Sequence, residues 1–278
     1  MLVVGVLTCG INFLMTKAAL EAAASEATHR ISRETLEEVE DLLAPAQMAI
    51  RLISHSSLAE AQSIEERLAR LPLVRDALDT SPVLQALYIG YVDGSFFYVR
   101  PLREDADRAV FRAPTHAAFV VRSVERANGA GQGRLYFLDR ELAVIQITDA
   151  WDFAAKFDPR QRPWYTSATA AGGLIRTEPY IFFSDRQAGA TLALPTSSRH
   201  AVVGGDFRFD RLGQMLARKE TVPRSMLALL DASEQVIAID RALPESASAP
   251  DTIRSGLLAA PADYGLPILT QLAAGVGA

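Results

Sequence analysis

The sequence contains a single cysteine, Cys9, among 278 residues, so an internal disulfide framework is excluded. Cys9 lies within an apolar run, where a small buried or lipid-facing side chain is its expected role. The four histidines, His29, His55, His116 and His200, show no metal-binding spacing with one another or with Cys9. We therefore predict no metal site and no cofactor.

Basic residues are not in excess, since 28 Lys and Arg stand against 33 Asp and Glu, for a net charge of -5. This balance gives no electrostatic support for nucleic-acid binding. A nucleophile elbow, a zinc-protease motif and a nucleotide-binding motif are also lacking, so we predict no catalytic residues and no enzymatic activity in this chain. Any catalytic output domain, such as a nucleotide cyclase, would lie beyond it.

Two glycine-containing stretches resemble functional motifs but lack a required residue. Asn128–Gly133 has no Lys-Ser/Thr of a phosphate-binding loop and predicts a hairpin turn. Gly204–Phe207 is one acidic residue short of the diguanylate cyclase signature and lies in a strand pattern. Neither stretch carries a catalytic prediction.

The apolar run Leu2–Met15 has no positive charge before it, which is unlike a signal peptide. It approaches the roughly 20 residues of a spanning helix when Ala18–Leu20 is added. We predict a transmembrane helix or signal anchor over residues 1–20, in the bacterial inner membrane, with the bulk of the chain in the periplasm. Cleavage after Ala22–Ala24 and a buried amino-terminal helix are the alternatives.

A long linking helix is predicted over residues 21–60. Apolar residues recur there at alternating steps of three and four, as expected for one face of a helix: Leu36, Val39, Leu43, Ala46, Ile50 and Ile53. Pro45 should kink this helix or divide it in two.

After residue 60 the pattern becomes β-rich. Leu84–Tyr91 and Ser95–Arg100 are strand-like and are joined by an Asp93-Gly94 hairpin signal. Ser63–Leu78 predicts a short helix, and further strands are predicted over 118–125, 134–138, 142–148, 189–195 and 201–209. A helix is expected to begin at Leu212, Met226–Ile239 predicts a hairpin of two apolar runs around a polar turn, and residues 242–262, rich in Pro, Ser and Ala, predict a loop. Successive short strands behind amino-terminal helices indicate an α+β fold with an antiparallel sheet.

The segment Phe157–Tyr165, with the sequence FDPRQRPWY, is the most informative for function. Asp158-Pro159 starts a turn, and Pro163 fixes the backbone before Trp164 and Tyr165. Arg160 and Arg162 offer planar sets of donors suited to a carboxylate or phosphate, while the rings supply apolar walls. This chemistry suits a pocket for a small anionic or zwitterionic molecule, and equally suits an arginine–aromatic stack that stabilises a loop.

Asp206 lies between apolar residues on a predicted central strand, where an unpaired carboxylate would be costly. It should therefore have a fixed partner, which would be a structural donor, an arginine or the amino group of a ligand.

The order of a long helix, the hairpin Tyr91–Gly94, Asp158–Tyr165, Glu178–Tyr180 and Val202–Asp206 resembles the double Cache family of bacterial extracytoplasmic sensors. The local sequence is most similar to that of family members found at the amino-terminal end of bacterial adenylate/guanylate cyclases. The resemblance covers roughly residues 17–278 and implies two PAS-like modules, a complete membrane-distal one over 61–222 and a partial membrane-proximal one over 223–278.

The resemblance also implies a ligand site. Arg162, Trp164 and Tyr165 match the residues that hold a ligand carboxylate in amino-acid-binding members, while Tyr180 and Asp206 match two that hold its amino group. Phe182 stands where a further Asp is expected, which weakens the cation-binding end. An organic acid is then as good a candidate as an amino acid.

The predicted function is the ligand-sensing region of a bacterial transmembrane receptor of the cyclase, kinase or chemoreceptor type. Its expected partners are a small-molecule ligand, the membrane and a second copy of the chain, which pairs through the amino-terminal helix. A secreted or periplasmic binding protein without signalling output is the alternative. An extracytoplasmic hydrolase is a third possibility, for which no group of residues argues.

Overall fold

The computed structural model describes residues 2–127, 130–183, 185, 187–209, 212–214, 228–231, 233 and 235–239. Contacts between residues divide the chain into two compact units, 1–44 and 45–278. The predicted boundaries after residues 20, 60 and 222 remain predictions.

Helix α1 spans Leu2–Ser54 without a break, with Pro45 inside it. Division of the helix at Pro45, one of the two outcomes expected there, does not occur. The residues after Pro45 explain why, because Ala46, Ile50 and Ile53 are each at most 2% exposed and their burial stabilises the last turns. Within the described residues, no helix contains a stretch that is both long and apolar enough for a membrane crossing.

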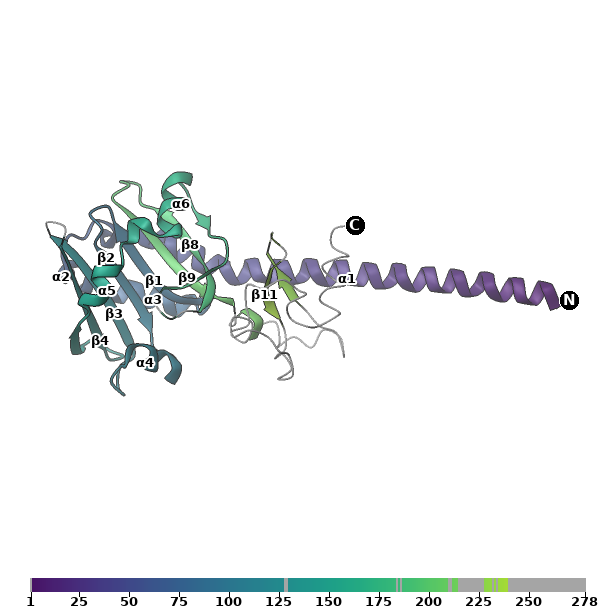
Figure 1. Ribbon diagram of the computed structural model, residues 1–278, viewed down its shortest axis with the longest axis horizontal. Coiled ribbons are helices and arrows are strands. Elements are labelled where there is room, and N and C mark those ends of the chain that lie inside the picture. The colour runs from purple at the N-terminus through teal and green to yellow at the C-terminus, as the bar shows by residue number, and fades with distance from the viewer. Residues whose placement is uncertain are drawn as a thin grey trace. The chain divides into compact units, whose positions relative to one another are not determined.

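A nine-stranded antiparallel sheet forms the centre of the unit 45–278, in the order β5-β4-β3-β2-β1-β9-β8-β6, with β7 paired to β8 (Figure 1). Its strands are β1 (Leu84–Tyr91), β2 (Phe96–Pro101), β3 (Phe119–Ala127), β4 (Ala130–Leu138), β5 (Val144–Asp149), β6 (Ile175–Arg176), β7 (Tyr180–Ile181), β8 (Ala188–Pro195) and β9 (Ala201–Arg208). The predicted α+β class, a long amino-terminal helix followed by an antiparallel sheet, is confirmed.

Two predicted hairpins are present in the sheet. β1 pairs antiparallel with β2 around Gly94, whose φ of 87° is in the left-handed region that the Asp-Gly signal anticipates. β3 pairs antiparallel with β4, and this ladder reaches Ala127 and Ala130. Residues 130–133 of the predicted turn belong to β4, while residues 128 and 129 lie outside the described residues.

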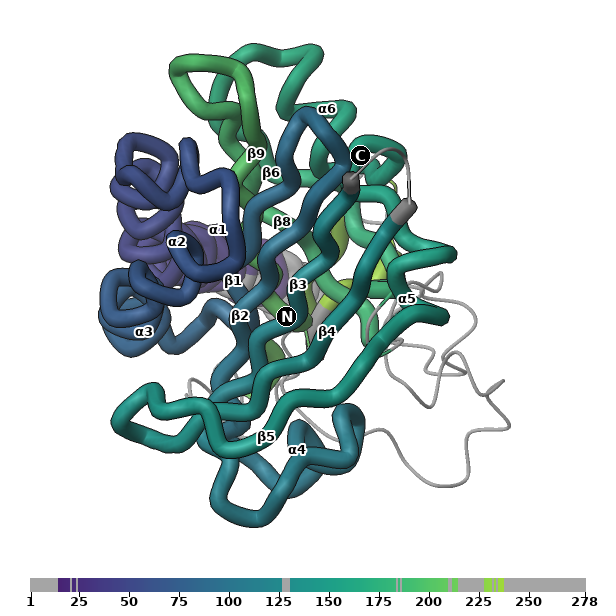
Figure 2. Tube along the Cα trace, turned by 90° about the vertical axis from the view of Figure 1, so that its left-hand side faces the viewer, coloured from purple at the N-terminus to yellow at the C-terminus, as the bar shows by residue number. Residues whose placement is uncertain are grey.

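Both faces of the central strands are covered, which explains why β1 is buried almost throughout instead of alternating. Figure 2 shows α2 (Ile64–Leu68) and α3 (Leu71–Thr80) on one side of the sheet and α5 (Trp151–Lys156) on the other. Tyr88 belongs to the apolar cluster on the α5 side, together with Trp164. This second face carries the candidate site.

Short helices make up most of what the sequence did not predict. The predicted helix of residues 63–78 is broken into α2 and α3, and α4 (Asp105–Phe111), α5 and α6 (Pro163–Ala171) were not expected. Six to nine residues carry too little periodic pattern for recognition. In α6, Pro163 occupies the first turn, where its missing N–H is no loss, so it starts a helix that carries the two aromatic residues.

In the last part of the chain, β10 (Ala228–Leu230) and β11 (Val236–Ile239) form an antiparallel two-stranded sheet. This hairpin agrees with the one predicted at the start of the partial second module. The helix expected to begin at residue 212 is described only over 212–214, and the predicted loop of 242–262 lies outside the described residues.

Candidate functional site

A buried cluster of hydroxyl groups surrounds Asp206 in the middle of the sheet. The Tyr88 hydroxyl donates to Oδ1 of Asp206 at 2.5 Å, and the Thr191 hydroxyl donates to the same oxygen at 2.6 Å. Tyr180 lies 2.7 Å from the Thr191 hydroxyl, so its own hydroxyl can donate there. Strand register explains the arrangement, because Thr191 of β8 is directly opposite Asp206 of β9 on one face of the sheet.

Burial raises the pKa of Asp206 to about 7, although the hydrogen bonds from Thr191 and Tyr88 act in the opposite direction. Within the described part of the chain, no partner is found for the second carboxylate oxygen, Oδ2. The expected fixed partner of Asp206 is therefore a pair of hydroxyl donors, and one oxygen is left for a ligand. Tyr88 and Thr191 were not predicted, because their alignment with Asp206 depends on strand register.

Trp164 of α6 forms an apolar wall beside this cluster. Its ring is 3% exposed and lies edge-on to the Tyr88 ring, with 4.9 Å between the centroids. The wall is possible because Gly90 of β1 lacks a side chain, since a Cβ there would lie 2.8 Å from Cη2 of Trp164 and 2.7 Å from Cβ of Pro159. Gly90 therefore fixes how closely α6 approaches the sheet.

Arg162 immediately precedes α6 and is its N-cap residue. Its guanidinium carbon lies 5.7 Å from the centroid of the Phe157 ring and 5.2 Å from that of Phe183. Among the residues that the structure describes, the Arg162 side chain forms no ion pair or hydrogen bond. A half-buried cation held between rings, without a carboxylate, is available to an anionic ligand.

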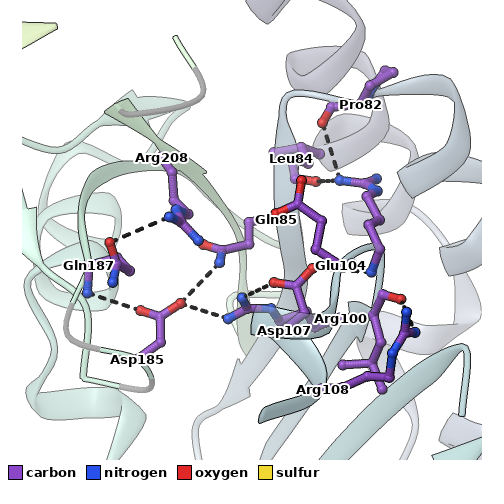
Figure 3. Close-up of polar contacts among 12 residues, drawn as sticks. Pro82, Leu84, Gln85, Arg100, Glu104, Asp107, Arg108, Asp185, Gln187 and Arg208 are labelled. Atoms are coloured by element: carbon purple, nitrogen blue, oxygen red, sulfur yellow. Dashed lines mark hydrogen bonds and ion pairs between the residues drawn. The ribbon is translucent and has the colours of Figure 1, made fainter. Parts of the chain in front are cut away.

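Phe182 and Phe183 lie in the loop that follows β7. Phe182 is 2% exposed and packs edge-on against Tyr180, with 5.2 Å between the ring centroids. The loop is held in place by Asp185, whose Oδ2 accepts hydrogen bonds from Arg100 Nη1 at 2.7 Å and from Gln85 Nε2 at 3.0 Å (Figure 3). Strands β1 and β2 thus anchor the loop that carries one wall of the site.

These walls enclose a cavity with an empty volume of about 380 Å³, including the solvent at its mouth. Most of its lining is aromatic, and two arginines and an aspartate reach it from different elements, as is typical of small-molecule sites. The cavity is lined by Tyr88, Phe96, Tyr98, Arg122, Phe153, Phe157, Arg162, Trp164, Tyr180, Phe182, Phe183 and Asp206.

All the predicted site residues except Tyr165 lie in this lining. Tyr165 lies beside Gly90, as Trp164 does, since a Cβ at Gly90 would lie 3.2 Å from Cδ2 of Tyr165. Tyr165 directly follows Trp164 on α6, where successive residues point in directions about 100° apart, and only Trp164 of the two lines the cavity. For Tyr165, the role of a wall and hydroxyl donor is therefore not supported by its position.

Arg122 of β3 is a lining residue that the sequence did not reveal. It lies opposite Tyr98 of β2, and its guanidinium carbon is 3.9 Å from the centroid of the Phe153 ring. The side chain is nearly buried, with 9% exposed, and burial lowers its pKa. The sequence of β3 has valines both before and after Arg122, so its apolar pattern does not reveal whether the arginine points into the core or to solvent.

The described residues contain no cluster of potential metal ligands.

No family model matches the chain. Its curated relatives include adenylate cyclase 1 of Rhizobium meliloti, 26% identical over 235 residues, which cover 84% of this chain and 35% of that protein. They also include the methyl-accepting chemotaxis protein PctB of Pseudomonas aeruginosa, 43% identical over 58 residues, which cover 20% of this chain and 9% of that protein. The chain thus spans about a third or less of the relatives' length.

A solved structure similar to this chain is the ligand-binding domain of PctB from Pseudomonas aeruginosa in complex with L-Arg. The TM-score is 0.48 and the identity 20%, over 77% of this chain and 69% of that one. The curated relatives are a cyclase and chemotaxis proteins, in agreement with the prediction of a sensor region of a signalling receptor.

Proposed function

We propose that this chain is the extracytoplasmic, ligand-sensing region of a bacterial transmembrane signalling receptor, and that the cavity beside α6 binds a small anionic or zwitterionic metabolite. The observation that carries the proposal is the position of Arg162, a cation without an acidic partner among the described residues, in the same cavity as Asp206. Aromatic rings between them supply a desolvated surface on which each polar contact is strengthened.

Different residues of the cavity would contact different parts of the ligand. Arg162 would clamp a carboxylate through its planar donors, and Trp164, Phe182 and Phe183 would cover the apolar body of the ligand. Asp206 would accept from a donor on the opposite end, using the oxygen that Tyr88 and Thr191 leave free. The chain itself would be non-catalytic, and the enzymatic or signalling output would belong to the remainder of a longer receptor.

The topology of the receptor is part of the proposal. Residues 1–20, at the start of α1, would anchor the chain in the inner membrane and leave the sheet in the periplasm. Two copies would pair through α1, which exposes Leu36 to 58%. A ligand would act by favouring one arrangement of the pair, which requires a higher affinity for that arrangement than for the other.

A thermal-shift screen of organic acids and amino acids tests the cavity. A ligand present at about 100 times its dissociation constant should stabilise the folded chain by roughly 2.7 kcal/mol, which is readily measured. Arg162→Gln should abolish the shift and leave the melting temperature of the unliganded chain nearly unchanged. Arg160→Gln is the matched control, since Arg160 pairs with Asp158 at 2.7 Å and does not line the cavity.

Two results would contradict the proposal. If no compound of either class raises the melting temperature, the cavity does not bind such metabolites. If Arg162→Gln lowers the melting temperature of the unliganded chain strongly, the arginine stabilises its loop and is not reserved for a ligand. The alternative function, a secreted binding protein without signalling output, shares the binding result and would be favoured if cells release the processed chain.

A further inference from the structure

Arg122 places a second cation in the cavity that contains Arg162. Its contacts are with aromatic faces: the guanidinium carbon lies 3.9 Å from the ring centroid of Phe153 and 5.3 Å from that of Phe111. The Nε atom of Arg122 is buried and has no hydrogen-bond partner among the residues that the structure describes. This is an incomplete environment for a guanidinium, which has five N–H donors.

The charge of Arg122 is not compensated by a neighbouring acid. No carboxylate of the described residues lies within ion-pair distance of it, and the acid that influences its pKa, Asp185, is already paired with Arg100 at 2.7 Å. A buried charge without a partner costs several kcal/mol in general, and contacts with rings recover only part of this cost. The remainder would be recovered by an anion that enters the cavity.

The two arginines reach the cavity from different elements, with aromatic rings between them. Phe153 contacts Arg122, its ring is stacked 4.7 Å from that of Phe157, and Phe157 lies 5.7 Å from the guanidinium carbon of Arg162. Each arginine therefore has its own position for a carboxylate. Asp206 is the one acidic side chain among the described lining residues, so it can offset at most one of the two positive charges.

Resting on the proposed function, we infer that the ligand carries two carboxylate groups, one held by Arg162 and the other by Arg122. A planar guanidinium binds a carboxylate through two parallel hydrogen bonds, and the arginines would give this recognition at both ends of a short dicarboxylate. Phe153 and Phe157 would contact the carbon chain that joins the carboxylates. A monocarboxylate would leave the buried charge of Arg122 uncompensated.

Isothermal titration calorimetry on the full 278-residue chain tests this inference. Malonate, succinate and glutarate are each compared with their half-amides, which keep the size and replace one carboxylate by a neutral group. At least one dicarboxylate should bind about tenfold or more tightly than its half-amide, as expected for a charge-assisted pair in a desolvated site. Arg122→Gln should reduce this ratio to below about threefold and leave the affinity for the half-amide within about threefold.

Two further variants complete the design. Arg122→Lys keeps the charge without the planar donors, so its ratio should fall between those of the wild type and Arg122→Gln. Arg140→Gln removes an exposed arginine that does not line the cavity and should leave the ratio unchanged. If Arg122→Gln does not fold, the comparison of Arg122→Lys with the wild type decides the question.

The outcomes separate this inference from the proposed function. If half-amides or monocarboxylates bind the wild type as tightly as the dicarboxylates do, the cavity binds anions but Arg122 is not a second clamp. The same conclusion follows if an Arg122 substitution weakens all ligands equally. If the wild type binds none of the dicarboxylates and half-amides in this titration, and none of the organic acids and amino acids in the thermal-shift screen, the proposed function fails as well.

Discussion

Arg100 and Asp185 form an ion pair of 2.7 Å in which both side chains are 1% exposed. The pair joins β2 to the loop after β7, across 85 positions of sequence. Phe182 and Phe183 precede Asp185 in that loop, and both line the cavity. The position of this loop therefore depends on residues that do not themselves line the cavity.

We predict that Asp185→Asn destabilises the chain and opens the site. Arg100 keeps its bond to Asp107, so the expected loss is roughly 1–3 kcal/mol in the free energy of unfolding, less than for a charge left with no partner. Urea denaturation gives this value, and Asp105→Asn is the control, because that side chain is fully exposed and its replacement should leave the stability nearly unchanged. Equal stability of the two variants would show that the buried pair does not hold the loop.

Site residues could be predicted from the sequence where several functional side chains lie close together in one segment. Arg162 and Trp164 stand close together in the sequence, their combination with Tyr180 and Asp206 came from the resemblance, and all four residues line the cavity. Phe182 also lies there, buried where the resemblance implies an acid, which removes one carboxylate from the site.

Other parts of the site depend on relationships between distant segments. Tyr88 and Thr191 reach Asp206 through strand register, and Arg122 points inward because of the pairing of β2 with β3. Tyr165 lies outside the cavity lining, and the helix α6 that orients it was not predicted, so its ligand role stays a prediction. Nine residues around a proline give no periodic signal by which such a helix could be recognised.

Gly90→Ala should disturb Trp164. A methyl group at this position would lie 2.8 Å from the indole ring and 2.7 Å from Pro159, so α6 must move away from β1. We expect a loss of about 1–3 kcal/mol in the free energy of unfolding, as for other overpacked cores, together with weaker ligand binding. The matched control is Gly173→Ala, since a Cβ at Gly173 has no atom within 4 Å. If the two variants are equally stable in urea, the close approach of α6 is not required.

The pH dependence of stability should report the burial of Asp206. Its pKa is raised from 3.8 to about 7 in the folded chain, so between these values the folded state holds a proton that the unfolded state has lost. This contribution is fully present below about pH 4 and is lost as the pH rises through about 7, at roughly 1.4 kcal/mol per pH unit. The difference in unfolding free energy between the wild type and Asp206→Asn should therefore fall steadily between pH 5 and pH 7, as measured by urea denaturation. A difference that does not vary with pH would mean that Asp206 ionises at its ordinary pKa.

Proton linkage should also reveal which group of the ligand lies beside Asp206. A carboxylate near it raises its pKa further, so binding takes up a proton and the affinity falls as the pH rises through about 7. A ligand ammonium that contacts the free oxygen of Asp206 lowers the pKa, so binding releases a proton and the affinity rises as the pH rises toward about 7. Calorimetry at pH 7 in two buffers of different ionisation enthalpy counts these protons, and succinate compared with aspartate varies only the amino group. With Asp206→Asn as the control, the proton change should vanish for both ligands. A change that persists in this variant would assign the titration to another group.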